Sequence, residues 1–190
     1  MFALANVGEG CLLVFLPHRA ADLGLGTSGY GYLVAAMTAG ELVAGLVLAR
    51  RGWRWQLPIS IVVAQLGAAL SVLVLIAPTT ASTLLALVLL GLLTAPMTAW
   101  AQTLRMRVAP PEGHGRLFAL LRTVMQATPP LGAGLGALVL PRGPAVTVVS
   151  IAAVIALPAL LLGPSLLGPA AAGAHDPPWT SEEEIEEVVS

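Results

Sequence analysis

The strongest constraint on the fold is a series of six long apolar stretches. They cover residues 1–16, 28–48, 57–76, 83–101, 117–140 and 145–162. An α-helix needs about twenty apolar residues to cross a hydrocarbon core of about 30 Å. A membrane-spanning strand would instead alternate apolar and polar residues, and these stretches do not alternate. We therefore expect an all-α integral membrane protein with six transmembrane helices.

Charged residues are too scarce to cover a soluble surface. They make up 10 % of the chain, against 57 % hydrophobic residues, whereas soluble proteins carry about a quarter charged residues. The net charge of −1 gives no attraction for a polyanion. These values exclude a cytosolic globular domain, a disordered protein and a nucleic-acid-binding protein.

The sequence predicts a membrane domain followed by a tail. Residues 1–163 hold the six stretches, and residues 164–190 form a linker rich in Pro, Ala and Gly with an acidic end. The first stretch lacks the basic start of a secretory signal, so we interpret it as a membrane helix. At about 24 Å it is short, which indicates either a half-depth helix or a natural chain that begins earlier.

The arginines predict the orientation, because cytoplasmic loops carry an excess of Lys and Arg. The second and fourth connections together hold six arginines, whereas the first holds Arg19 and the fifth holds Arg142. This bias places both termini in the cytoplasm. The expected location is the cell membrane, which the chain crosses several times.

Enzyme motifs are weak in this sequence. The chain has no lysine and therefore no P-loop for ATP, and a single cysteine, Cys11, excludes a disulfide within the chain and a Cys-rich zinc site. Gly26-Thr-Ser28-Gly29 has the form of the rhomboid-protease serine motif, which needs a histidine base on a later membrane helix. His18, His114 and His175 fall in connections and in the tail. We expect no enzyme activity, no cofactor and no metal site.

Two stretches on the cytoplasmic side resemble the major facilitator superfamily. Residues 45–54, GLVLARRGWR, resemble its G-x-L-a-D-R-x-G-R-K loop, with departures at positions 49 and 53 and matches at Gly45, Arg50, Gly52 and Arg54. Residues 102–140 are similar to the segment joining helices ten and eleven in the drug- and siderophore-exporter branch, through Arg107, Pro110 and Gly115-Arg116.

The resemblance implies twelve helices in two six-helix halves around a central cavity, of which this chain supplies the C-terminal half. The implied function is secondary active transport, with proton-coupled efflux of small amphipathic or drug-like molecules. The implied partners are the bilayer, the substrate and a second half, which is another copy of the chain or a missing N-terminal half. The alternatives are a non-transporting membrane scaffold or partner subunit, or a truncated product without function.

Ionisable residues inside the apolar stretches are candidate functional residues, because charge within a bilayer is costly. Glu9 lies midway along the first stretch, with Asn6 one turn before it on the same side. The first helix of each half lines the cavity in the resembling family, so Glu9 is the candidate proton-coupling or cation-binding carboxylate. The alternative is a structural hydrogen bond. Gln126 is a further candidate for the cavity wall, near Pro129-Pro130, which should bend its helix.

Glu41 and Arg122 are a second candidate pair. Counted from the ends of their stretches, they lie about 10 Å and about 8 Å from the same side of the membrane. Their helices sit on opposite sides of a half in the resembling family, so they would meet across the interface between two halves. In a homodimer, Glu41 of one chain would pair with Arg122 of the other. The alternative is an Arg122 side chain that reaches back to the headgroups.

Small residues at intervals of four predict close helix packing in the membrane. One series lies in the second stretch and the other in the fifth, and the residues are Ala36, Gly40, Ala44, Gly132 and Gly136. They indicate either packing within the six-helix unit or an interface between two halves.

Overall fold

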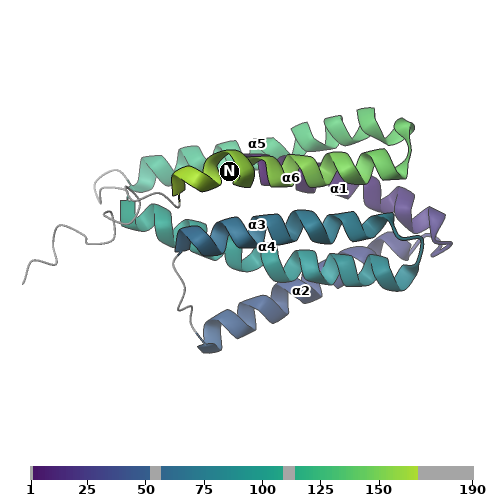
Figure 1. Ribbon diagram of the computed structural model, residues 1–190, viewed down its shortest axis with the longest axis horizontal. Coiled ribbons are helices and arrows are strands. Elements are labelled where there is room, and N and C mark those ends of the chain that lie inside the picture. Colours follow the sequence, from purple (N-terminus) through teal and green to yellow (C-terminus); the bar gives the residue numbers. More distant parts are fainter. Residues whose placement is uncertain (1, 52–56, 109–113, 167–190) are drawn as a thin grey trace, which may run out of the picture.

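The computed structural model describes residues 2–51, 57–108 and 114–166, which form an all-α bundle with no strand in these ranges (Figure 1). Its α-helices are α1 Phe2–Asp22, α2 Gly29–Arg51, α3 Leu57–Leu73, α4 Thr80–Val108, α5 His114–Val139 and α6 Pro144–Leu166. The 3-10 turns Val74–Ile76 and Leu140–Arg142 follow α3 and α5. Each predicted apolar stretch corresponds to one helix.

Helices α2 to α6 are long and apolar enough to cross a membrane. Helix α1 differs because it carries Glu9, His18 and Arg19 among its 21 residues. The sequence prediction ended the first stretch at residue 16, but the helix continues through Pro17 to Asp22 and is about 32 Å long. His18 and Arg19 therefore belong to a helix, and their predicted place in a connection was wrong.

Other boundaries also differ from the prediction. Helix α4 starts at Thr80 because Thr79 caps it, with its Oγ1 accepting the backbone N–H of Ser82 at 3.1 Å. Helix α5 starts at His114, which the prediction had placed in a connection. Helix α6 continues to Leu166, past the predicted domain boundary at 163. The remainder of the predicted linker and the acidic tail, from residue 167, lie outside the described residues.

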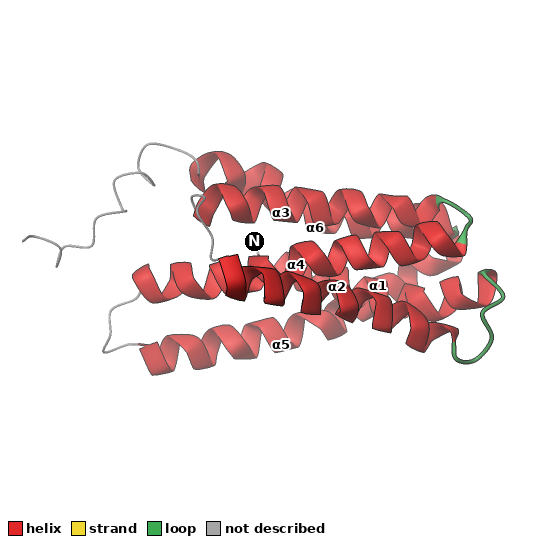
Figure 2. Cartoon of the chain, turned by 90° about the horizontal axis from the view of Figure 1, so that it is seen from below, coloured by secondary structure: helices red, strands yellow, loops and turns green. Residues whose placement is uncertain are grey.

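The helices pack as an open arc. Helix α2 packs mainly on α4, α4 also on α3, α3 on α6, α6 on α1, and α1 on α5, while a smaller contact joins α1 to α2. The ends of the arc, α2 and α5, are the least buried spans, with 22 % and 17 % of their residues buried against 39–56 % in α3, α4 and α6. Figure 2 shows α3 and α5 on opposite sides of the bundle.

The main hydrophobic core closes one end of the bundle. It joins the second half of α1 to the first half of α2 and to α3, α4 and α6, and its largest buried members include Leu12, Phe15, Leu33, Leu87 and Ile151. All of these lie toward the end of the bundle where α1 meets α2. The core therefore leaves space toward the other end, where α5 begins.

Glycines bring α1 and α5 into direct backbone contact. A Cβ atom on Gly10 would overlap the carbonyl group of Pro129, and one on Gly132 would overlap the carbonyl group of Val7. Gly136 approaches the backbone of Cys11 in the same way. Such close approach needs small residues, so the predicted glycines of α5 pack within the six-helix unit.

A second glycine contact joins α2 to α4. Gly40 faces the backbone of α4, and Gly91 of α4 faces the backbone of α2, each with no room for a Cβ atom. In the predicted small-residue series, Ala44 is also buried and Ala36 is half-buried. The two most extensive helix contacts of the bundle, α2–α4 and α1–α5, are thus both built around glycine.

Arg19 anchors the end of α1 to the connection between α3 and α4. Its side chain is only 6 % exposed. The guanidinium donates from Nε and Nη2 to Thr83 Oγ1 at 3.3 and 3.2 Å, and from Nη2 to the carbonyl oxygen of Ala77. These bonds compensate for the burial of a charged group, which would be costly without them.

We expect Gly132→Ala to lower the free energy of unfolding by about 1–3 kcal/mol, the usual cost of overpacking. Thermal unfolding in detergent measures the change. Gly134→Ala is the matched control, because a Cβ atom on Gly134 meets nothing within 4 Å. Equal behaviour of the two variants would contradict the backbone contact between α1 and α5.

We expect Arg19→Lys to lower the free energy of unfolding by about 1–3 kcal/mol, because a lysine cannot reproduce the forked hydrogen bonds to Thr83 and Ala77. Arg142→Lys is the control, since Arg142 is exposed and bonds only to the Leu138 carbonyl within its own segment. A destabilisation of Arg142→Lys as large as that of Arg19→Lys would contradict this role.

Candidate functional site

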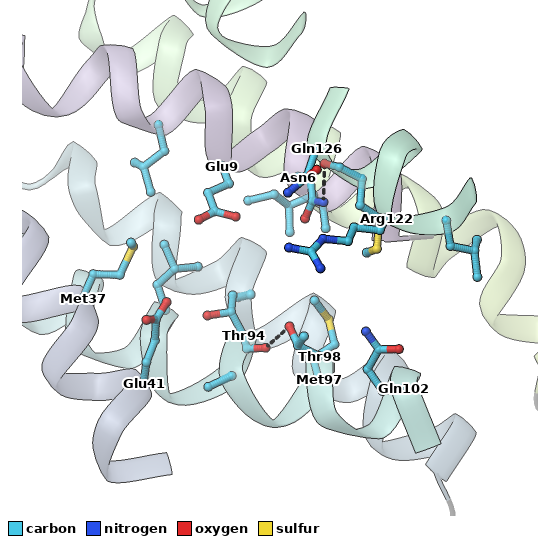
Figure 3. A pocket seen from close by; sticks show the side chains of 18 of the residues that line it. Asn6, Glu9, Met37, Glu41, Thr94, Met97, Thr98, Gln102, Arg122 and Gln126 are labelled. Carbon is cyan, nitrogen blue, oxygen red and sulfur yellow. Dashed lines mark hydrogen bonds between the residues drawn. The ribbon is translucent and has the colours of Figure 1, made fainter. Parts of the chain in front are cut away.

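A cavity of about 890 Å³ lies between the pair α1–α5 and the pair α2–α4. Ala68 of α3 and Ile155 of α6 contribute to its wall. The polar residues that line it come from four helices (Figure 3), and they are Asn6, Glu9, Glu41, Thr94, Thr98, Gln102, Arg122 and Gln126. The predicted candidates Asn6, Glu9, Glu41, Arg122 and Gln126 therefore line one cavity within a single chain.

Counted along the helices, the backbone of Glu9 and of Glu41 lies deeper in the bundle than that of Arg122. The residue after Glu9 contacts Pro129, which is 15 residues, or about 22 Å, from the start of α5. The backbone nitrogen of Glu41 lies beside Gly91, 17 residues or about 26 Å from the same end of the bundle. Arg122 is only 8 residues, or about 12 Å, from that end.

Glu9 and Glu41 thus share one level near the middle of the bundle. The sequence predicted Glu41 at the same depth as Arg122, and this prediction was wrong, because depth counted from the end of each stretch ignores how the helices are offset. Within the described ranges the one ion pair joins His18 and Asp22, at 3.7 Å on the surface of α1. The expected Glu41–Arg122 pair between two copies stays a prediction.

The proline pair in α5 leaves a backbone carbonyl group without its helical donor, and Asn6 of α1 donates a hydrogen bond to it. Pro129 has no N–H to donate to the carbonyl oxygen four residues earlier, that of Met125. Asn6 Nδ2 donates to this oxygen at 3.2 Å (Figure 3), and Thr128 Oγ1 donates to it at 2.9 Å. Asn6 therefore forms a structural hydrogen bond at the cavity wall and joins α1 to the interrupted turn of α5.

Helix α4 supplies the uncharged polar wall. Thr94, Thr98 and Gln102 recur at every fourth residue and so share one face of the helix. Thr98 Oγ1 donates to the carbonyl oxygen of Thr94 at 3.1 Å, which leaves the oxygen of the hydroxyl group as an acceptor toward the cavity. Gln65 of α3, by contrast, is fully buried and donates to the Ile155 carbonyl at 2.9 Å.

The predicted cytoplasmic loop motif lies away from the cavity lining as far as it is described. Gly45 and Arg50 are exposed on α2, toward its C-terminal end. Gly52 and Arg54 lie outside the described residues. The motif therefore contributes no described side chain to the cavity.

Several apolar lining residues escaped the sequence analysis, because an apolar side chain in an apolar stretch carries no distinguishing signal. They include three methionines and an aromatic residue: Met37, Met97, Met125 and Phe118. Helical spacing offered a partial signal, since Met37 lies four residues before Glu41 and Phe118 four residues before Arg122. The glycines Gly10 and Gly91 were also missed.

The lining is suited to binding a small organic molecule. Its volume falls within the range of about 300–1,000 Å³ that is typical of small-molecule sites. The walls combine two carboxylates, one guanidinium and three amides with apolar side chains. In the part of the chain that the structure describes, no three His, Cys, Asp or Glu side chains are grouped to hold a metal ion.

A comparison with known families adds a direct assignment. The family model described as Major Facilitator Superfamily matches residues 1–187 of the 190. The match covers both helix pairs that enclose the cavity and every described helix. No curated protein and no solved structure matches the chain, so the assignment depends on the family model and agrees with the all-α fold.

We expect Asn6→Ala to lower the free energy of unfolding by about 1 kcal/mol, the usual net value of such a hydrogen bond. In a Pro129→Ala background the helix can supply its own donor to the Met125 carbonyl, so there the Asn6→Ala change should cost less. A double-mutant cycle measured by thermal unfolding isolates this coupling. Strict additivity of the two substitutions would contradict a hydrogen bond from Asn6 to the Met125 carbonyl that depends on Pro129.

Proposed function

We propose a function from one premise: the chain belongs to the Major Facilitator Superfamily and is a membrane transporter of that superfamily. Members of the superfamily are transporters rather than enzymes, and the apolar helices agree with a multi-pass membrane protein. The specific proposal is proton-coupled efflux of small amphipathic or drug-like molecules through the cavity between α1–α5 and α2–α4.

One observation carries the proposal: two carboxylates lie in the cavity near the middle of the bundle. A charged carboxylate there is costly unless a proton or another cation accompanies it. Glu9 on α1 and Glu41 on α2 can therefore exchange a proton for a substrate group at the same place. This exchange is the elementary step that a proton-coupled transporter requires.

The open arc supports a second six-helix half as partner. Helices α2 and α5 end the arc, flank the cavity and are the least buried spans. Alternating access requires a second set of helices that rocks against the first around the substrate. We propose that this half, either another copy of the chain or a separate half, closes the cavity from the side between α2 and α5.

We further propose that the chain lies in the cell membrane with both termini on the cytoplasmic side. Arg50 lies at the end of the bundle where α5 begins, on the side of the arginine-rich connections. Arg19, which the sequence analysis counted for the opposite side, is buried and hydrogen-bonded within the protein. It therefore adds no charge to a loop there, and the arginine bias toward the cytoplasmic side becomes stronger.

We expect Glu9→Gln to abolish proton-coupled uptake of a fluorescent amphipathic dye, because the amide cannot exchange a proton. The measurement uses inside-out vesicles from cells that express the full chain, with an imposed pH gradient. Glu9→Asp should keep part of the activity, since it keeps the carboxylate.

Asp22→Asn is the matched control, because it removes a carboxylate at the exposed end of α1, away from the cavity. It should transport like the wild type. With the second half present, wild-type vesicles that take up no more dye than vesicles without the protein would contradict the proposal. Full activity of Glu9→Gln would contradict it as well.

A further inference from the structure

We infer that the cavity binds a monovalent organic cation at the level of Glu9 and Glu41. The inference deepens the proposed function and depends on it in one respect, namely that the bound cation is the molecule transported. It concerns the charge of the ligand, which neither the fold nor the family match specifies.

The described cavity lining has an unequal number of positive and negative side chains. Helix α1 contributes Glu9, α2 contributes Glu41 and α5 contributes Arg122, while α3, α4 and α6 contribute only uncharged side chains. With both carboxylates ionised, this lining carries one negative charge in excess. An uncompensated charge at the depth of a membrane is costly, and one positive charge in the ligand would neutralise it.

The positions of the charged residues also favour a cation. The two carboxylates share one level near the middle of the bundle. The backbone of Arg122 lies about 10 Å nearer the end where α5 begins, by the rise of the helix, and its side chain extends from there into the cavity. In Figure 3 the side chains of Glu9 and Glu41 project from two facing helices toward the space between them. A cation in that space would separate two like charges and be attracted by both.

The backbone of α5 adds an acceptor of the same sign. Pro130 has no N–H, so the carbonyl group of Gln126 lacks its helical donor, whereas that of Met125 already accepts from Asn6 and Thr128. Gln126 lines the cavity. A carbonyl oxygen carries partial negative charge, so this part of α5 favours a positive ligand, as the two carboxylates do.

The apolar part of the wall favours an organic cation over a metal ion. Met37, Met97 and Met125 line it with adaptable thioether side chains, and Phe118 adds an aromatic ring to the lining. In the described ranges no third His, Cys, Asp or Glu joins the two carboxylates to complete a metal site. The volume of about 890 Å³ also exceeds what a metal ion needs.

The test uses two probes of the same shape and opposite charge, tetraphenylphosphonium and tetraphenylborate. Equilibrium dialysis against the purified full chain in a neutral detergent measures their affinities. We expect the cation to bind at least about tenfold more tightly than the anion, which corresponds to about 1.4 kcal/mol. Equal binding, tighter binding of the anion, or no binding of either probe would overturn the inference.

Substitutions locate the binding within the cavity. Glu9→Gln and Glu41→Gln should each weaken binding of the cation, and Arg122→Gln should strengthen it, because it removes the one described positive charge in the lining. Asp22→Asn is the control for loss of a carboxylate elsewhere and should leave the affinity unchanged. Because Arg122→Gln predicts a gain, a general loss of folding cannot imitate it. An effect of Asp22→Asn as large as that of Glu9→Gln would overturn the inference.

The vesicle measurement separates this inference from the proposed function. Dye uptake that requires Glu9, combined with preferential binding of the anion, would leave the transport proposal standing and overturn the cation inference. Preferential binding of the cation that requires Glu9 and Glu41, without proton-coupled uptake, would support the site and overturn proton-coupled transport as its use.

Discussion

The architecture depends on direct backbone contact between helices at glycine. Gly10 and Gly132 join α1 to α5, while Gly40 and Gly91 join α2 to α4. Because water provides no driving force between helices inside a bilayer, association there depends on close packing of this kind. The contacts hold the helices as two tight pairs and leave space between the pairs. The same contacts fix the offset of α1 against α5 and of α2 against α4, and this offset brings Glu9 and Glu41 to one level.

The chemistry of the site follows from interruptions in otherwise regular helices. Pro129 leaves the Met125 carbonyl without its helical donor, and Asn6 of α1 supplies one instead. The glycine contact at Gly10 lies beside the same proline. One short stretch of α5 therefore serves both the packing of α1 and the polar wall of the cavity. Substitutions in this stretch of α5 will therefore also affect the packing of the helix that carries Glu9.

Sequence predicted the helices well, because a long apolar stretch in a membrane protein has few alternatives to a helix. The end of α1 was missed for a physical reason. Pro17, His18 and Arg19 interrupt the hydrophobicity, and only tertiary partners, Thr83 and the Ala77 carbonyl, satisfy the arginine there. The individual site residues could be predicted, since an ionisable side chain within an apolar stretch is conspicuous. Their relative depth could not be, because helix offset depends on contacts between residues far apart in the sequence.

The outer surface of the bundle explains which side must be covered. Exposed side chains in the described parts of α3 and α6 are all apolar, as suits contact with lipid. Helix α5 instead exposes Thr123, together with the cavity-lining residues Arg122 and Gln126, next to apolar neighbours such as Leu120. A guanidinium and an amide at this depth are costly against hydrocarbon. The side between α2 and α5 therefore needs water or protein against it, and the proposed second half supplies both, as the opposite wall of a water-accessible cavity.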